Sequence, residues 1–218
     1  MPELNLSLDR GGHACHLFRD FSDQKGLVLP FFKRGLRDGE YCIYITAEQS
    51  VDDWCFEFQA YGVDVLAERE RGALDIITGD AWYSGGDFNS VIKARDAWKL
   101  IQDHLLDFSG VRIAGDAAWA LSPTPLPVSQ LCHWEATANL VYEDMDVRAV
   151  CQYDLNRHSP AAIHSALRTH QTVVMDGQCY TNPSYEATRI LRHEPGLNDS
   201  KADARLVEEL LSKLTPVN

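Results

Sequence analysis

Residues 41–46 read Tyr-Cys-Ile-Tyr-Ile-Thr, a nearly continuous apolar and β-branched stretch. A run of this kind is typical of a strand that is buried on both faces, as happens when helices cover both sides of a parallel sheet. Apolar residues at helical spacing precede it over residues 27–36 and follow it from about residue 50 to residue 61. The stretch therefore predicts a central strand of an α/β fold.

The same alternation of strands and helices continues in both directions. Strands are predicted over 13–18, 74–78, 111–114, 147–153 and 172–175, and helices over about 88–105, 131–141 and 160–168. Pro30 lies inside the first helix and predicts a kink or a later start there, and residues 79–87 are predicted to form a loop. The pattern indicates an α/β fold of three layers, with a mostly parallel central sheet and helices on both faces.

The last part of the chain has a different character. Residues 198–203 are polar, and residues 204–214 predict an amphipathic helix with Leu206, Leu210, Leu211 and Leu214 on one side. We therefore divide the chain into one domain over residues 1–195 and a tail over 196–218. The tail helix either covers the sheet or docks on a partner.

Charge and composition exclude several function classes. The formal net charge of −12 repels phosphate backbones, which argues against direct binding of nucleic acid. No apolar run is long enough to span a bilayer, and no basic stretch with an apolar run opens the chain, so we expect a cytoplasmic protein without membrane contact. The six cysteines form no CxxC pair and are expected to be reduced and buried.

The turn after the first predicted strand lacks a phosphate-binding loop. It reads Phe18-Arg19-Asp20, without the glycines and the lysine whose backbone amides and ammonium group cradle phosphates. This absence argues against a working nucleotide hydrolase.

The segment His13-Ala-Cys-His16 is the most unusual local feature. Alternation along a strand places His13 and Cys15 on one face and His16 on the other. A metal site here would need Cys151, His170 or Cys179 from distant segments, and no known zinc spacing is present. We therefore predict core histidines and packed thiols, with no metal and no cofactor. No nucleophile elbow accompanies the cysteines, so no catalytic residue is assigned.

Polar and aromatic residues near the predicted strand ends suggest a ligand pocket. Asp116 and Asp154 each follow a strand directly, where a carboxylate faces a bound ligand or caps a helix. Five aromatic residues are predicted to converge on the same edge of the sheet, namely Phe18, Trp119, Tyr153, Tyr180 and Tyr185. Such an edge suits a small, weakly polar ligand, although each ring can equally pack a helix onto the sheet.

Six ordered blocks between Gly11 and Tyr185 carry a family resemblance. They are His13-Ala-Cys-His-Leu-Phe-Arg-Asp, Leu29-Pro-Phe-Phe-Lys-Arg-Gly-Leu-Arg-Asp-Gly-Glu, Ala114-Gly-Asp-Ala-Ala-Trp, Cys151-Gln-Tyr-Asp, Arg168-Thr-His and Asn182-Pro-Ser-Tyr. In that order they resemble the MEDS domain, the sensory domain found in methanogens, methylotrophs and the dichloromethane dehalogenase repressor. The chain carries Asp116 where many members have glutamate.

The resemblance implies a fold and a function. The fold would be RecA-like, as in the clock protein KaiC, with the phosphate loop lost and the strands that carry Cys15 and Cys151 side by side. The function would be intracellular sensing of a small, apolar molecule such as a hydrocarbon derivative, with output through a kinase or DNA-binding partner; self-association stays open. We predict ten ligand-binding residues: His13, Cys15, Phe18, Asp116, Trp119, Cys151, Tyr153, Asp154, His170 and Tyr185. The alternatives are an enzyme, either a residual nucleotide hydrolase or a cysteine-dependent transferase, and a structural adaptor.

Overall fold

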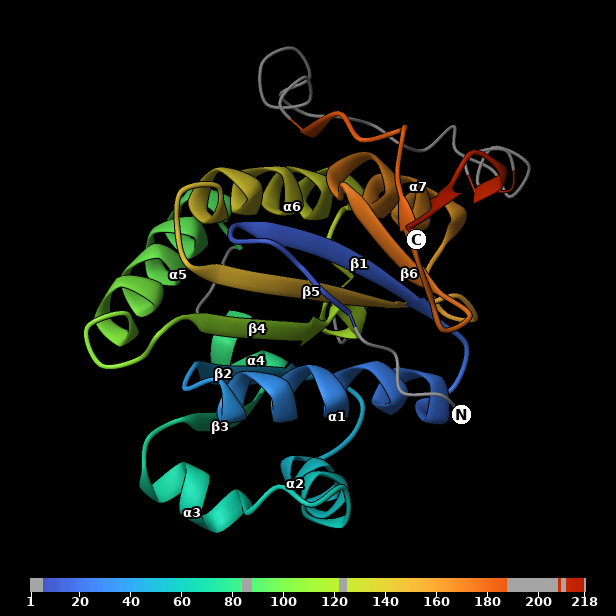
Figure 1. The fold of residues 1–218 in the computed structure, drawn as a ribbon. Coiled ribbons are helices and arrows are strands. Elements are labelled where there is room, and N and C mark those ends of the chain that lie inside the picture. Colours follow the sequence, from blue (N-terminus) through green and yellow to red (C-terminus); the bar gives the residue numbers. More distant parts are fainter. Residues whose placement is uncertain (1–5, 84–87, 122–124, 188–207, 209–210, 218) are drawn as a thin grey trace.

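A central sheet of eight strands, in the order β3-β2-β4-β5-β1-β6-β7-β8, organises the molecule (Figure 1). The computed structural model describes residues 6–83, 88–121, 125–187, 208 and 211–217. The six strands from β3 to β6 in this order are parallel to one another. The pairings of β6 with β7 and of β7 with β8 are antiparallel. The predicted three-layer, mostly parallel α/β fold is confirmed.

The central parallel strands are largely buried because helices cover both sides of the sheet. Their bounds are β1 Gly12–Phe18, β2 Tyr41–Thr46, β3 Leu74–Thr78, β4 Val111–Asp116, β5 Val147–Asp154 and β6 Thr172–Met175. All six residues of β2 are buried, as the apolar stretch predicts. Strands β1 and β5 pair with Cys15 opposite Cys151, so the two cysteines are neighbours, as the resemblance implied.

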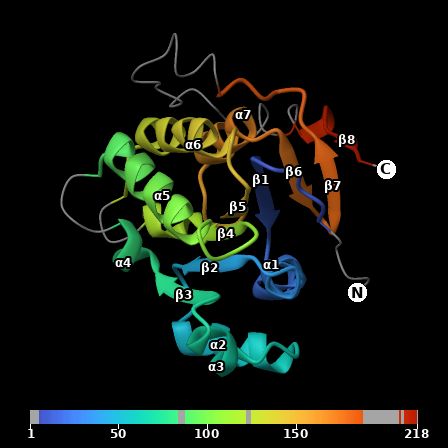
Figure 2. The same cartoon turned by 60° about the vertical axis from the view of Figure 1, so that its left-hand side comes forward.

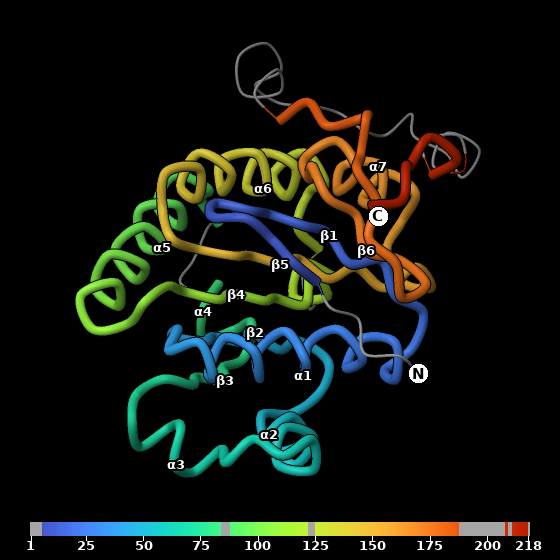
Figure 3. The backbone as a smooth tube through the Cα atoms, viewed as in Figure 1, coloured from blue at the N-terminus to red at the C-terminus, as the bar shows by residue number. Residues whose placement is uncertain are grey.

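The helices form the outer layers, with α1, α2 and α3 on one face and α5, α6 and α7 on the other (Figures 1 and 3). Their bounds are α1 Phe21–Arg37, α2 Val51–Ala60, α3 Val65–Glu70, α4 Gly79–Tyr83, α5 Ser90–His104, the short 3₁₀ helix η1 Ala117–Leu121, α6 Val128–Tyr142 and α7 Pro160–Thr169. Side chains alternate along each strand between an α1-side core that contains Ala14 and Val150 and an α6-side core that contains Cys15 and Tyr153.

Local sequence accounts for the helix starts. Asp20 caps α1 by accepting a hydrogen bond from the Asp23 amide at 2.9 Å, and Ser50 caps α2 in a capping box with Asp53. Helix α1 begins six residues before the apolar pattern and continues through Pro30. Because a carboxylate occupies its N-terminus, where a RecA-type fold would bind phosphate, the turn after β1 is unsuited to an anion.

Several short elements differ from the sequence-based expectation. Residues 79–83 of the predicted loop form helix α4, and α3 was not predicted. The hairpin partner β7, Gln178–Thr181, was also missed; Asp176 and Gly177, both with positive φ, connect it to β6 as a two-residue turn. Strand β8, Thr215–Pro216, then pairs with β7 (Figure 2).

The predicted tail helix lies mostly outside the described residues. Of its four leucines, Leu211 and Leu214 are described, and both pack against the α6-side core. None of the helices in the described part of the chain combines the length and the apolar character that a membrane span requires.

Candidate functional site

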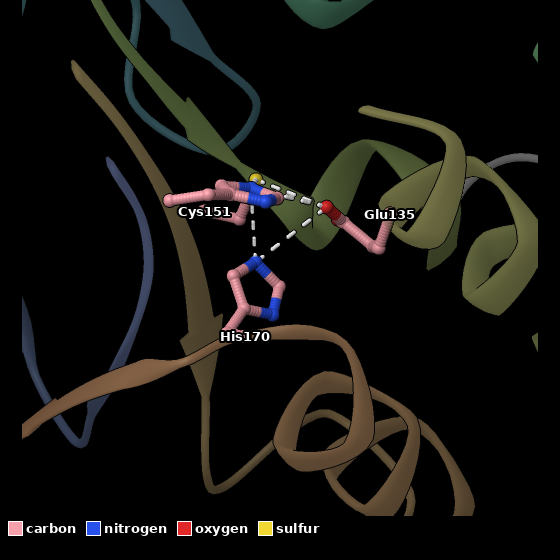
Figure 4. A group of neighbouring side chains, drawn as sticks. Glu135, Cys151 and His170 are labelled. Carbon is pink, nitrogen blue, oxygen red and sulfur yellow. Dashed lines mark hydrogen bonds and ion pairs between the residues drawn. The ribbon is translucent and has the colours of Figure 1, made fainter. Parts of the chain in front are cut away.

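Four side chains from separate elements meet between the sheet and helices α6 and α7. They are His13 on β1, Glu135 on α6, Cys151 on β5 and His170 at the end of α7, and they are named the buried cluster below. One N, O or S atom from each lies within 4.8 Å of all the others. Figure 4 shows Glu135, Cys151 and His170 pointing toward one another.

Tertiary structure brings these residues together in three ways. His13 pairs in register with Ala149, so Cys151 lies two residues further along β5 on the same face of the sheet. His170 directly follows the last residue of α7, its backbone is extended, and its ring lies in the cluster. Glu135 lies on the buried face of α6, where its side chain is shielded from solvent.

The distances within the buried cluster are short. His13 Nε2 lies 3.0 Å from His170 Nε2, 3.3 Å from Cys151 Sγ and 3.5 Å from Glu135 Oε2. Glu135 Oε2 lies 3.3 Å from Cys151 Sγ and 3.6 Å from His170 Nε2. The Tyr153 hydroxyl donates to the other carboxylate oxygen, Oε1, at 2.7 Å. One nitrogen, sulfur or oxygen atom of each of the four side chains therefore faces the same point.

Burial dominates the electrostatics of this group. It raises the pKa of Glu135 to about 7, although hydrogen bonds from Tyr153 and Cys151 oppose the shift. It lowers the pKa of His170 to about 4, and together with the His170 ring it holds the pKa of His13 well below the ordinary value. Burial also raises the pKa of the Cys151 thiol well above its usual range. With only protein neighbours, both imidazoles are neutral and Cys151 is a poor nucleophile.

Two spaces border the buried cluster. On one side, His13 lines a surface groove of about 280 Å³, together with Arg10, Asn139, Gln171 and Tyr185 among others. On the other side, Glu135 and Cys151 line an internal cavity of about 20 Å³, whose walls include four aromatic rings: Trp82, Tyr83, Trp134 and Tyr142. His13 thus borders the groove, whereas Glu135 and Cys151 border the cavity.

The structure places the ten predicted site residues in different surroundings. His13, Cys151 and His170 belong to the buried cluster, Tyr153 contacts it, and Cys15 lies beside Cys151 in the core. Tyr185 lines the groove, and Trp119 stacks on Tyr83 with ring centroids 3.7 Å apart. Phe18 lies on the opposite face of the sheet, and Asp154 accepts a hydrogen bond from the Asn156 amide at the end of β5. Tyr180, like Trp119, packs against the α6-side core that contains Tyr153.

Asp116 belongs to a second polar group, on the α1 side of the sheet. Its Oδ1 accepts from the Ala118 amide at 2.9 Å, which caps η1, and its Oδ2 accepts from Gln24 at 3.3 Å. Gln24 also reaches the Tyr44 hydroxyl, which donates to Gln152 at 3.0 Å. The capping role considered for Asp116 is therefore present in the structure.

Replacing Asp116 by Asn should change how stability depends on pH. Burial, with a smaller contribution from the Asp154 charge, raises the pKa of Asp116 from 3.8 to about 6. The folded state therefore holds this proton more tightly than the unfolded state, and wild-type stability should fall as pH rises from about 4 to about 6. Asp116→Asn should be more stable than wild type at pH 7.5 by on the order of 1 to 3 kcal/mol, and the difference should vanish near pH 4. Urea unfolding at both pH values measures it; a variant that is less stable at both would contradict the prediction.

Glu135 was not predicted from the sequence. A signal does exist, because the residue sits within the predicted apolar face of its helix, four positions after Leu131 and three before Ala138. An acid in such a stripe must be exposed at the edge of the face or buried with polar partners. The partners come from β5, β1 and the end of α7, which the helix sequence cannot reveal.

Comparison with known proteins agrees with the fold and defines the family. A KaiC-like protein from the hyperthermophilic archaeon Pyrococcus horikoshii is similar in structure, with a TM-score of 0.58 and 14% identity over 79% of this chain and 76% of that chain. At this identity the likeness concerns the fold alone. A search of curated proteins found no match. The family model of MEDS, the methanogen/methylotroph, DcmR sensory domain, matches residues 12–171, and the chain therefore belongs to the MEDS family of sensory domains.

Proposed function

We propose that this chain senses a small, weakly polar molecule that binds in the internal cavity beside Glu135 and Cys151, and that it signals through a partner protein. The observation that carries the proposal is the cavity itself, in which aromatic rings surround two members of the buried cluster. Membership in a family of sensory domains supports the regulatory role. Apolar walls with a few fixed polar groups are the usual character of small-molecule sites.

The size and lining of the cavity favour a ligand of very few heavy atoms. A volume of about 20 Å³ is close to that of one water-sized molecule. Trp82 and Tyr83 belong to the short helix α4, which packs on the sheet, and a shift of these side chains would enlarge the space. Aromatic rings favour an apolar or weakly polar guest over an ion.

Output through a partner is supported by the surface of α5. This helix packs against α6, which carries Glu135, and Ala97 of α5 lines the cavity. On its outer side Val91, Ile92 and Trp98 are exposed, and Val91 and Trp98 are separated by two helical turns. A ligand that moves α5 would thus change an apolar surface that a partner can contact.

Filling the cavity should weaken ligand binding. Intrinsic tryptophan fluorescence is a suitable signal, because Trp82 and Trp134 line the space. With methanol, methanethiol and dichloromethane as probes, we expect a saturable change for at least one of them. In Ala97→Leu, whose longer side chain projects into the cavity, binding of that probe should weaken at least about 10-fold, or about 1.4 kcal/mol.

The matched control is Ala94→Leu, the same substitution one turn earlier on α5 at a buried position that does not line the cavity. It should retain probe binding while showing a comparable overpacking cost of about 1 to 3 kcal/mol in unfolding experiments. The proposal fails if none of the probes produces a saturable change, or if Ala97→Leu binds as tightly as the wild-type chain.

A further inference from the structure

We propose that His13, Glu135, Cys151 and His170 bind a divalent transition-metal ion of the zinc class through His13 Nε2, His170 Nε2, Cys151 Sγ and Glu135 Oε2. The inference goes beyond the sensing function and does not depend on it, because metal binding is measured without any ligand. It rests on the positions of the four ligand atoms and on the hydrogen bonds that orient them.

The spacing of the four atoms is close to that of a tetrahedral site. With metal–ligand bonds of about 2.0 to 2.3 Å, the edges of a tetrahedron are about 1.6 times longer, or roughly 3.3 to 3.7 Å. The separations from His13 Nε2 are 3.0, 3.3 and 3.5 Å, and those from Glu135 Oε2 to Cys151 Sγ and His170 Nε2 are 3.3 and 3.6 Å. The sixth separation, from Cys151 Sγ to His170 Nε2, is at most 4.8 Å, so the four atoms can contact one ion after side-chain shifts of up to about 1 Å.

Hydrogen bonds to the other polar atoms of His170 and Glu135 leave the ligand atoms free to coordinate a metal ion. His170 Nδ1 lies 2.8 Å from the Ala166 carbonyl oxygen, an acceptor, so Nδ1 carries the proton and Nε2 of the neutral ring has a lone pair. Tyr153 donates to Glu135 Oε1 and leaves Oε2 directed at the cluster. Contacts of this kind, from a carbonyl to a histidine and from a donor to a carboxylate, are the usual supports of metal ligands.

Without a metal ion, the protons available to the buried cluster cannot satisfy all of its polar atoms. If His13 Nε2 donates to His170, that single proton cannot also serve the contacts with Cys151 and Glu135. In that tautomer Nδ1 of His13 is an acceptor, and it is buried without a hydrogen-bond partner in the described part of the chain. A metal on Nε2 removes the competition for that proton, which Nδ1 then carries.

The chemistry of the ligands narrows the choice of metal. One thiolate and one carboxylate together carry two negative charges, which compensate a divalent cation in a buried site. Two imidazoles and a thiolate favour zinc, iron(II) or cobalt(II) over magnesium and calcium, which prefer sets of oxygen ligands. The cavity of about 20 Å³ borders two of the four ligands, Cys151 and Glu135.

The test uses the full chain. We expect about one zinc or iron per chain as purified, measured by native mass spectrometry and elemental analysis. After chelation and reconstitution with Co²⁺, the protein should show the intense visible absorption of tetrahedral cobalt and a thiolate-to-cobalt charge-transfer band. Cys151→Ser should lose that band, and His170→Gln and Glu135→Gln should each weaken Co²⁺ binding at least 10-fold, as expected for loss of a ligand.

Cys15→Ala is the matched control, because Cys15 is the register neighbour of Cys151 on the same face of the sheet but is not one of the four ligands. It should keep both the cobalt spectrum and the metal content. Circular dichroism establishes that each variant folds, and Glu135→Gln and His170→Gln decide the matter if Cys151→Ser does not fold.

Two results would overturn the proposal: wild-type protein that takes up neither zinc nor cobalt, or a thiolate band that disappears in Cys15→Ala and persists in Cys151→Ser. Failure of the sensing function looks different. A chain that binds metal normally but shows no saturable response to the three probes would disprove sensing in the cavity and leave the metal site intact.

Discussion

A Tyr153→Ala variant is expected to lose about 3 to 5 kcal/mol of folding free energy, the usual range for truncation of a buried aromatic side chain. Tyr153 is fully buried in the α6-side core, where its ring packs near His158 and His170. Its hydroxyl also donates to Glu135 Oε1. The substitution therefore opens a cavity and removes a hydrogen bond from a buried carboxylate. Urea unfolding measures the loss.

Tyr153→Phe separates the two contributions. It keeps the ring and deletes only the donor, so it should cost about 1 to 3 kcal/mol. If the hydroxyl orients a metal ligand as proposed, Tyr153→Phe should in addition weaken Co²⁺ binding by about 10-fold to 100-fold. A Tyr153→Ala protein as stable as wild type would show that the packing around this residue differs from that described.

Glu40→Ala should be comparably destabilising, by about 3 to 5 kcal/mol, because it leaves a buried arginine without its counter-charge. Glu40 is buried and pairs with Arg112 Nε on β4, and its other oxygen lies 3.2 Å from Arg148 Nη1. Arg112 is also buried and donates to the Phe31 carbonyl at 2.8 Å. These contacts join α1, β4 and β5, so their loss should be felt throughout the domain.

Two further variants test this account by urea unfolding. Arg37→Ala removes an exposed arginine that pairs with Asp38 at 3.2 Å, and it should cost at most about 1 kcal/mol. The double variant Glu40→Met/Arg112→Met removes both charges and should be less destabilised than Glu40→Ala. If Glu40→Ala costs no more than Arg37→Ala, the buried pair does not contribute as described.

The sequence by itself determined the class of fold. The apolar run of residues 41–46 predicted a strand with the observed bounds, because burial on both faces demands continuous apolar character. Residues 74–78 were also predicted with the observed bounds, although Asp75 and Thr78 are exposed there. The turn after β1 lacks the residues of a phosphate loop, and α1 is capped there by Asp20. The six motif blocks identified the family, which the family model confirms.

Other features escaped the sequence because their signals are short or ambiguous. Helices α3 and α4 span only six and five residues, too few for a helical period to be recognised. The antiparallel strand β7 is partly exposed, so it lacks the apolar run that marks the parallel strands. Its Asp176-Gly177 turn was the available signal.

The candidate site was decided by tertiary structure. The sequence singled out His13, Cys151 and His170, but it could not show that their ligand atoms meet, nor that Glu135 completes the group. Two residues on one strand face can be assigned from alternation, whereas the meeting of two strands, a helix face and a helix end depends on strand order, register and helix packing. Those long-range relations are set by how the whole core packs, and the same packing separates Asp116 and Phe18 from His13 by placing them on the other face of the sheet.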